Sequence, residues 1–277
     1  MSDASAYIME HPREAQRLLD KVDAEAWIAK FIEPHLAGAR SFLSVGSGPG
    51  VFLRELAKRY PEMKVVGVDL SPARVRVAEE RLSGLPNAHV FVGDVLSLPF
   101  ESNSFDVVFS RFLMEYVPDK QLAVREMSRV CVPGGTLLLQ DLDGQLVWHF
   151  PEDPQLQKDT ERVLSILAGT GFDPFVGRKL FSLCLGAPLR DLRVQVDPYH
   201  LYAGRIDEKE FANWQSKLEI ARPQIKAALG SDEAAQNFTE RFLAYLQNPA
   251  TLTYSCLFTV LANKPMATDS KHARGRI

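Results

Sequence analysis

The sequence has few features of a disulfide-bonded, membrane-spanning or nucleic-acid-binding protein. Its 277 residues include only 3 cysteines, and Cys131, Cys184 and Cys256 form no CxxC pair that would suggest a metal site. No apolar run approaches the roughly 20 residues that a transmembrane helix needs. The formal net charge of −3 gives no general electrostatic reason to bind phosphate backbones. We therefore expect no metal site, no membrane span and no nucleic-acid partner.

The N-terminal residues also carry no targeting pattern. The stretch MSDASAYIMEHPREAQ contains acidic residues and lacks the basic-then-apolar order of a signal peptide. We expect a cytoplasmic protein, either a monomer or a homodimer. The length suits one large α/β domain or a core domain with a cap.

Short apolar runs alternate with helical patterns through the first half of the chain. This order predicts a parallel sheet with crossover helices. Two more strands are expected near the C-terminus, separated by helical patterns from about Glu208 to Leu229 and from Glu233 to Leu246. The predicted strands are Phe42–Val45, Lys64–Val68, Ala88–Val92, Phe105–Ser110, Gly135–Gln140, Leu192–Leu201 and Thr251–Ala262.

The flanking regions have a different character. Residues 1–40 predict a helical cover, with an amphipathic helix from about Pro12 to Ile32. Residues 41–263 form the main predicted domain, in which 141–190 and 205–248 add loops and helices on the ligand side. Residues 264–277 are polar and predict a disordered tail.

A glycine-rich turn, Val45-Gly46-Ser47-Gly48-Pro49-Gly50, follows the first predicted strand. Bare backbone lets a ligand contact the main chain, and the following helix offers free N–H groups and a positive dipole end. A dinucleotide fingerprint needs a third glycine where this chain has Val51, so the spacing disfavours NAD. Taken alone, the turn is also compatible with a purely structural role.

Acidic residues follow the next two strands. Asp69 stands about 20 residues after the glycines, where a carboxylate can accept hydrogen bonds from ribose hydroxyls. Its alternative role, a helix cap, is better filled by Ser71. Asp94 and the Val95 N–H can together bind an adenine edge. The three elements suit an adenosine that carries a charged tail.

With these motifs the chain resembles the class I S-adenosylmethionine-dependent methyltransferases, specifically the small-molecule branch similar to ubiquinone and menaquinone C-methyltransferases. The resemblance covers roughly residues 40–142. It implies an α/β fold with a Rossmann-like, doubly wound, seven-stranded sheet whose last strand is antiparallel, an N-terminal helical lid and an insertion after strand five. The matching motifs are Val45–Gly50, Val66–Pro72, Gly93–Phe100, Ser104–Ser110 and Val130–Thr136.

The resemblance implies S-adenosyl-L-methionine as the cofactor. By the same likeness the glycines would line the methionine moiety, Asp69 the ribose, and Asp94 with Val95 the adenine. For Arg111, contact with the cofactor's carboxylate and an ordinary ion pair both stay open. The cofactor-binding residues expected in all are Gly46, Ser47, Gly48, Asp69, Leu70, Asp94, Val95, Arg111, Tyr7 and Arg17, the last two from the lid.

Two positions depart from the family pattern. Ser44 stands where relatives usually carry an acidic residue that orients the cofactor's ammonium, and Tyr116 stands where relatives often carry histidine. A sulfonium cofactor is already activated, so catalysis chiefly requires alignment of a nucleophile and exclusion of water. The candidate catalytic residues are Tyr116, Glu115 and His149, although each also has a structural reading; a lone histidine beside aromatics often only packs.

The sequence thus predicts a methyltransferase that acts on carbon or oxygen of a small, largely apolar or aromatic metabolite. Three alternatives remain: an NAD-type Rossmann oxidoreductase, a non-catalytic S-adenosylmethionine-binding protein, and a nucleic-acid or protein amine methyltransferase. The last is disfavoured because the fourth strand lacks an Asp/Asn-Pro-Pro-Tyr motif.

Overall fold

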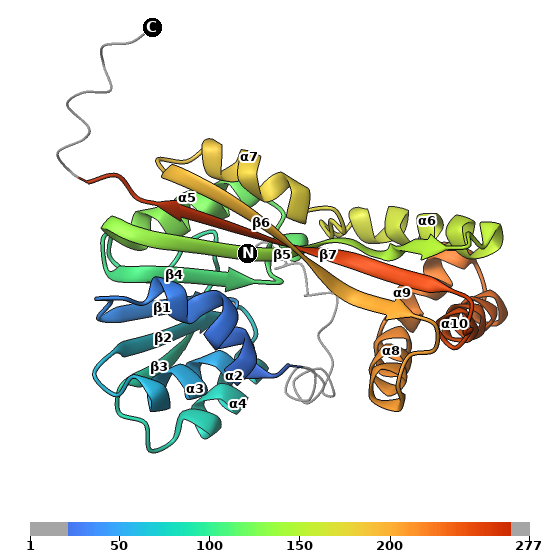
Figure 1. Ribbon diagram of the computed structural model, residues 1–277, viewed down its shortest axis with the longest axis horizontal. Coiled ribbons are helices and arrows are strands. Elements are labelled where there is room, and N and C mark those ends of the chain that lie inside the picture. The colour runs from blue at the N-terminus through green and yellow to red at the C-terminus, as the bar shows by residue number, and fades with distance from the viewer. Residues whose placement is uncertain (1–21, 267–277) are drawn as a thin grey trace, which may run out of the picture.

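The computed structural model describes residues 22–266, which form a seven-stranded mixed sheet with helices on both faces (Figure 1). The strand order is β3-β2-β1-β4-β5-β7-β6, and β7 is antiparallel to both of its neighbours while the other pairs are parallel. This confirms the predicted doubly wound fold with an antiparallel last strand. The strands are β1 Ser41–Val45, β2 Lys64–Asp69, β3 Ala88–Val92, β4 Phe105–Arg111, β5 Cys131–Phe150, β6 Arg190–Ala203 and β7 Leu252–Asn263.

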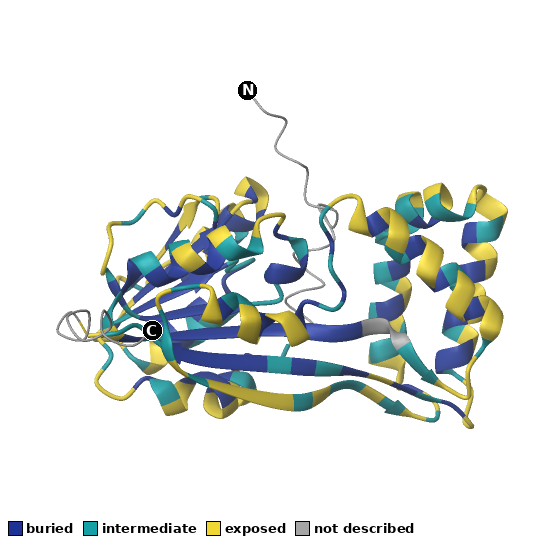
Figure 2. Ribbon diagram, turned by 90° about the horizontal axis from the view of Figure 1, so that it is seen from above, coloured by how far each residue is buried: buried dark blue, intermediate teal, exposed yellow. Residues whose placement is uncertain are grey.

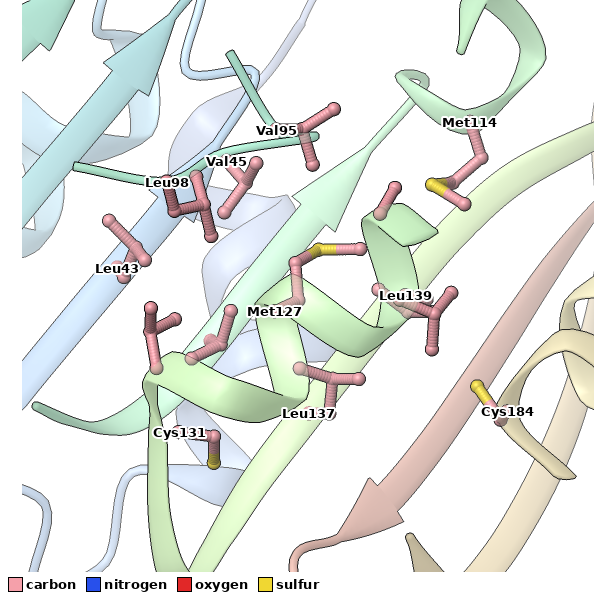
Figure 3. Close-up of a cluster of buried hydrophobic side chains, with 14 of the residues drawn as sticks. Leu43, Val45, Val95, Leu98, Met114, Met127, Cys131, Leu137, Leu139 and Cys184 are labelled. Atoms are coloured by element: carbon pink, nitrogen blue, oxygen red, sulfur yellow. The ribbon is translucent and has the colours of Figure 1, made fainter. Parts of the chain in front are cut away.

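Helices cover both faces of the sheet because successive strand residues point to opposite sides. Phe42 and Leu43 are neighbours on β1 and both fully buried, yet they belong to different hydrophobic clusters. Figure 3 shows part of the cluster that contains Leu43, in which Met127 and Cys184 pack against the sheet. The helices of this face are α5 Lys120–Val130 and α7 Leu180–Leu185; those of the opposite face are α3 Val51–Arg59 and α4 Pro72–Leu82.

Local capping signals fix where the crossover helices begin. Ser71 precedes α4, its side chain accepts a hydrogen bond from the Arg74 N–H at 3.3 Å, and Pro72 occupies the first turn. Asp119 caps α5 in the same way through the Leu122 N–H, at 2.9 Å. Both helices therefore begin directly after a loop at the carboxyl edge of the sheet, which places those loops around the candidate site.

Three long strands leave the core sheet and carry a separate helical layer, which we call the cap. Figures 1 and 2 show these helices gathered at the far end of β5, β6 and β7. The cap has its own hydrophobic cluster, in which Trp214 and Phe242 are almost completely buried. The cap helices are α6 Pro154–Ala168, α8 Glu208–Ile220, α9 Arg222–Leu229 and α10 Asp232–Leu246.

The predicted end of the fifth strand at Gln140 is wrong. β5 continues for ten more residues to Phe150, paired along the way with β7, so the expected insertion begins after the strand rather than at Asp141. The Asp-Leu-Asp-Gly stretch suggested a turn, yet Asp141 and Asp143 are buried, and their carboxylates accept hydrogen bonds from the N–H groups of Leu142 and Arg178. Pairing with a distant strand thus overrides the local turn signal.

Two irregularities interrupt the strand ladders at one level of β7. The register between β5 and β7 shifts between Asp143 and Trp148, and the register between β6 and β7 shifts between Tyr199 and Tyr202. Both shifts fall opposite residues 253–256 of β7. The cap therefore begins just beyond the level at which the β5–β7 and β6–β7 ladders are both interrupted.

The N-terminal part of the described chain is helical, whereas its C-terminal part continues from β7 along the sheet. Residues 22–40 contain α2 Ala24–Trp27, a π-helical segment Ile28–Ile32 and a short turn Glu33–His35, which pack on the α3/α4 face. Lys264 is not part of a disordered tail, because its ammonium donates hydrogen bonds to the carbonyl oxygens of Arg129 and Cys131. The remaining tail from 267, the lid before residue 22, and the predicted contacts Tyr7 and Arg17 lie outside the described residues.

Candidate functional site

A cavity of about 290 Å³ opens at the carboxyl edge of the parallel strands. It is lined by the loops after β1, β2, β3 and β4, together with Val22 of the N-terminal segment. All predicted cofactor-binding residues that the structure describes line this first cavity: Gly46, Ser47, Gly48, Asp69, Leu70, Asp94, Val95 and Arg111. The topology therefore gathers at one place residues that are far apart in sequence.

The glycine-rich loop lies over the end of β2. Gly46, Gly48 and Gly50 have φ of 71°, 54° and 74°, a region that L side chains rarely adopt. The N–H groups of Gly46 and Ser47 both donate to the Val68 carbonyl oxygen, at 2.8 and 3.0 Å. Gly50 is the N-cap of α3 and lies against Ala78 of α4, so it serves helix packing more than ligand contact.

Replacing Gly50 should cost more stability than replacing a glycine with the same backbone and open surroundings. A left-handed L residue costs roughly 1–2 kcal/mol. At Gly50 an added Cβ would also lie 3.0 Å from Ala78 Cβ, whereas at Gly84, with φ of 81°, it would meet nothing within 4 Å. We expect urea unfolding to show a larger loss for Gly50→Ala than for Gly84→Ala. Equal losses would show that helix packing does not require the Gly50 position to be bare.

Asp69 ties the glycine loop to the following helix. Its carboxylate is buried, with Oδ2 accepting from the Gly48 N–H at 2.8 Å and Oδ1 accepting from the Ser71 N–H at 3.0 Å. Oδ1 also accepts from Arg74 Nε at 3.1 Å, in an ion pair whose two side chains are about 10% and 7% exposed. The carboxylate thus orders the loop besides facing the cavity.

The sequence prediction missed Arg74, which lines the first cavity beside Asp69. A signal was present, because a cation in the first turn of a helix opposes the helix dipole and needs an acidic partner. Arg74 stands three residues after the N-cap Ser71, and Asp69 is the nearby acid that supplies the compensation.

Asp94 lines the cavity from the loop after β3. Its Oδ1 accepts a hydrogen bond from the Leu96 N–H at 2.9 Å, which fixes the turn around Val95. The preceding residue, Gly93, has no room for a side chain, since a Cβ would lie 2.8 Å from Val68 Cγ2. The loop therefore approaches β2 closely and brings Val95 to the cavity wall.

Ser44 lines the cavity with an uncharged side chain at the position where the family pattern has an acidic residue. It is buried in the middle of β1, in register with Gly67 of β2 and Phe109 of β4. Ionising a carboxylate at this position would require desolvation between two uncharged neighbours. A hydroxyl avoids that cost and leaves Asp69 as the buried acid that lines the first cavity in the described chain.

Arg111 lies at the end of β4 among aromatic rings. Its guanidinium carbon is 4.0 Å from the Trp27 ring centroid and 3.8 Å from that of Phe112, and the guanidinium donates a hydrogen bond to the Tyr199 hydroxyl. Such contacts stabilise a cation. Burial nevertheless lowers the pKa of Arg111. Sequence patterns gave no indication of this cluster, because its members come from the N-terminal segment, β4 and β6.

Glu115 and Asp141 form a buried acidic pair that lies outside the cavity lining. Asp141 Oδ2 accepts from the Glu115 N–H at 3.3 Å, and Oδ1 accepts from the Leu142 N–H at 2.9 Å. Burial, and then the charge of Glu115, raise the pKa of Asp141 well above its usual value. Arg111 and Lys120 are the cations whose charges reach the pair.

The raised pKa of Asp141 makes stability depend on pH in a definite direction. The folded state keeps a proton on Asp141 that the unfolded chain releases near pH 4, so this stabilisation is full below the unfolded pKa and is lost as pH rises toward the folded value. Asp141→Asn cannot ionise. We expect the wild type to lose more unfolding free energy than the variant between about pH 5 and about pH 8 in urea titrations. A variant that loses more would contradict the assignment.

The two remaining catalytic candidates lie in different places. Tyr116 lines the first cavity, and its ring lies 5.4 Å from that of Phe172 between centroids. His149 lies on the far part of β5, where Nδ1 is 2.9 Å from Thr253 Oγ1 and the ring packs 4.9 Å from that of Tyr245. His149 does not line the cavity. Of the three candidates, the structure brings only Tyr116 to it.

Residues 22–266 contain no cluster of three or more His, Cys, Asp or Glu side chains suited to a metal ion. Nor does any helix in this range combine the length and apolar character that crossing a membrane requires.

Comparison with known proteins bears directly on this cavity, because the model of a methyltransferase domain family matches residues 43–139. Residues 43–139 are thus similar to a methyltransferase domain. The predicted resemblance is confirmed over these residues, which run from β1 to the middle of β5 and contribute the loops around the first cavity.

Curated relatives match a little over half of this chain. Ajmaline N-methyltransferase of Rauvolfia serpentina is 31% identical over 58% of this chain and 54% of its own length. Malonyl-[acyl-carrier protein] O-methyltransferase of Halorhodospira halophila is 33% identical over 58% of this chain and 59% of its own. The chain spans about half the length of the curated relatives it matches.

A solved structure shares the fold of the methyltransferase domain. Phosphoethanolamine N-methyltransferase 2 of Haemonchus contortus, solved with phosphomonomethylethanolamine and S-adenosylhomocysteine, superposes with a TM-score of 0.52 and 20% identity. The match covers 82% of this chain and 49% of that one. At this identity the likeness supports the fold alone.

Proposed function

We propose that the protein is an S-adenosylmethionine-dependent methyltransferase that transfers a methyl group to carbon or oxygen of a small, largely apolar or aromatic molecule. The observation that carries this proposal is the first cavity, where the methyltransferase domain gathers the glycine loop, Asp69 and Asp94 at one sheet edge. The named relatives support methyl transfer, since two of them are an O- and an N-methyltransferase.

The residues that line the first cavity fit the cofactor. Gly46 and Gly48 leave bare backbone for the methionine moiety, and a Cβ at Gly46 would lie 3.1 Å from Leu113 Cδ1, so that the Leu113 side chain would have to shift. Asp69 would accept from the ribose hydroxyls, and Asp94 with the Val95 N–H would bind the adenine edge. Bound S-adenosylmethionine would supply a methyl group on a positively charged sulfur.

The chain's own contribution would be alignment and exclusion of water. Val117 and Pro118 close the cavity beside Tyr116 with apolar surface. Tyr116 is the candidate group for holding a proton or orienting an oxygen nucleophile, because the other two candidates do not reach the cavity. An electron-rich carbon nucleophile would need no such base.

A non-catalytic cofactor-binding protein is the second candidate. The observation that favours it is the uncharged Ser44 in the cavity lining, where the family pattern has an acidic residue. An NAD-type oxidoreductase has no comparable support, because Val51 begins α3 where the fingerprint needs glycine. The assembly state, monomer or homodimer, and the cytoplasmic location stay predictions.

The test is calorimetric titration of the full chain with S-adenosylhomocysteine, followed by a tritiated-methyl screen over phenols, quinones, indoles and polyketide-like acids. We expect stoichiometric binding and label transfer to at least one class. Absence of heat at high S-adenosylhomocysteine concentration would refute the proposal. Binding without transfer would favour the second candidate, and binding of reduced nicotinamide cofactor instead would favour the oxidoreductase.

A further inference from the structure

A second cavity, of about 360 Å³, shares part of its lining with the predicted cofactor site. Its walls come from the N-terminal helical segment, from β6 and from α8. Arg111 and Val22 line both cavities, and of these two residues Arg111 is the one with a charged side chain. A group bound in the second cavity beside Arg111 would adjoin the cofactor cavity.

The walls of the second cavity combine aromatic rings with charge. Trp27, Phe31, Tyr199 and Tyr202 supply the rings, a lining that suits a flat, apolar ligand. Its volume lies near the lower end of the usual range for small-molecule sites, roughly 300–1,000 Å³. A ligand the size of one or two aromatic rings would fit this lining.

The other charged side chains of this cavity are already paired. Lys30 forms an ion pair with Asp197 at 2.7 Å. Glu210 accepts a hydrogen bond from the Tyr202 hydroxyl at 2.6 Å. Asp23 is the N-cap residue of α2 and accepts a hydrogen bond from the Ala26 N–H. These groups have their charges or lone pairs engaged within the protein.

Arg111 forms no ion pair within residues 22–266. No carboxylate there lies within ion-pair distance of its guanidinium, and its buried Nε donates no hydrogen bond within the same residues. Aromatic rings and one hydroxyl surround it, and the buried Asp141 and Glu115 influence its charge without forming an ion pair with it in these residues. A guanidinium always carries its charge and offers five donors, and leaving such donors buried and unmet is costly.

We propose that the second cavity is the acceptor site of the methyltransferase and takes an aromatic molecule bearing a carboxylate, which Arg111 binds. This inference rests on the proposed function. The planar guanidinium matches a carboxylate in a two-point hydrogen bond, while the aromatic walls pack against the ring of the ligand. One other source could supply the same chemistry, namely the carboxylate of the cofactor's amino-acid end in the first cavity.

The first arm of the test compares charged and neutral probes on the wild-type full chain saturated with S-adenosylhomocysteine. Benzoate, cinnamate and indole-3-carboxylate are titrated against their primary amides, with ligand-observed saturation-transfer NMR as the readout. We expect at least one carboxylate to bind about tenfold or more tightly than its amide, since charged hydrogen bonds are the stronger ones. Equal binding, or no binding by any carboxylate, would overturn the proposal without needing a variant.

The second arm assigns the preference to Arg111. Arg111→Met should remove the preference for carboxylate, whereas Lys30→Met, which removes a paired cation from the same cavity, should retain it. Arg111→Lys keeps the charge and serves as a second variant if Arg111→Met unfolds. A preference that survives both Arg111 variants would overturn the assignment.

The third arm distinguishes the two sources of carboxylate and separates this inference from the proposed function. S-adenosylhomocysteine and methylthioadenosine, which lacks the amino-acid end, are titrated into wild type and Arg111→Met. We expect both affinities to change less than about threefold. A selective loss of S-adenosylhomocysteine affinity would place the cofactor's carboxylate at Arg111 and overturn the inference. Failure of the wild type to bind S-adenosylhomocysteine would instead refute the proposed function.

Discussion

Asp69→Ala should weaken binding of S-adenosylhomocysteine by roughly 10- to 150-fold, or about 1.5–3 kcal/mol, in calorimetric titrations. The loss has two sources, because the carboxylate would both hold the ribose and fix the Gly48 N–H. Removing it also leaves the buried Arg74 guanidinium without its ion-pair partner. We therefore expect a lower melting temperature as well as a weaker ligand.

Two variants separate these contributions. Asp69→Asn keeps an oxygen that can accept from the Gly48 N–H, so it should lose less stability than Asp69→Ala while still losing ribose affinity. Arg74→Met removes the cation and leaves the carboxylate, so its affinity should stay closer to that of the wild type. Unchanged affinity in Asp69→Ala would show that the ribose does not lie at this position.

Trp214→Ala should cost about 3–5 kcal/mol of unfolding free energy, the usual range for emptying a large buried aromatic position. The indole is almost fully buried, lies 5.3 Å from the Phe242 ring between centroids, and donates from Nε1 to the Tyr202 hydroxyl at 3.1 Å. Its removal leaves a cavity inside the cap and takes a hydrogen bond from Tyr202. Urea unfolding followed by circular dichroism measures the loss.

The same variant tests whether the cap contributes to the predicted cofactor site. No described residue of the four cap helices lines the first cavity. Affinity for S-adenosylhomocysteine should therefore remain within about twofold at a temperature where the variant is still folded. Trp214→Phe is the matched control, because it keeps a ring in the core and should cost less stability. A cofactor affinity that falls with cap stability would contradict this separation.

The sequence predicted most of the core because each signal there is local. Glycines with positive φ, the Ser71-Pro72 start of α4 and the two acids that leave neighbouring strands all act within a few residues of themselves. Parallel strands buried on both faces read as continuous apolar runs, so their positions were also predictable. The predicted strands of the first four positions accordingly match the observed ones to within one residue at each end.

The features that the sequence did not predict depend on partners distant along the chain. The far half of β5 is a strand because β7, more than a hundred residues later, pairs with it. The aromatic environment of Arg111 joins Trp27, Phe112 and Tyr199, which no periodicity relates. His149 is a clear case, since its neighbours Phe242 and Tyr245 are set by the cap and not by its own segment.

The doubled bulge opposite residues 253–256 of β7 has a mechanical consequence. A three-stranded ribbon resists bending where its ladders are continuous, and it is softest where hydrogen bonds are interrupted on both sides of the middle strand. The cap is thus joined to the core sheet through strands whose hydrogen bonding is interrupted at one level on both sides of β7. We therefore expect bending of the cap relative to the parallel strands to occur at this level, next to the Tyr199 that contacts Arg111.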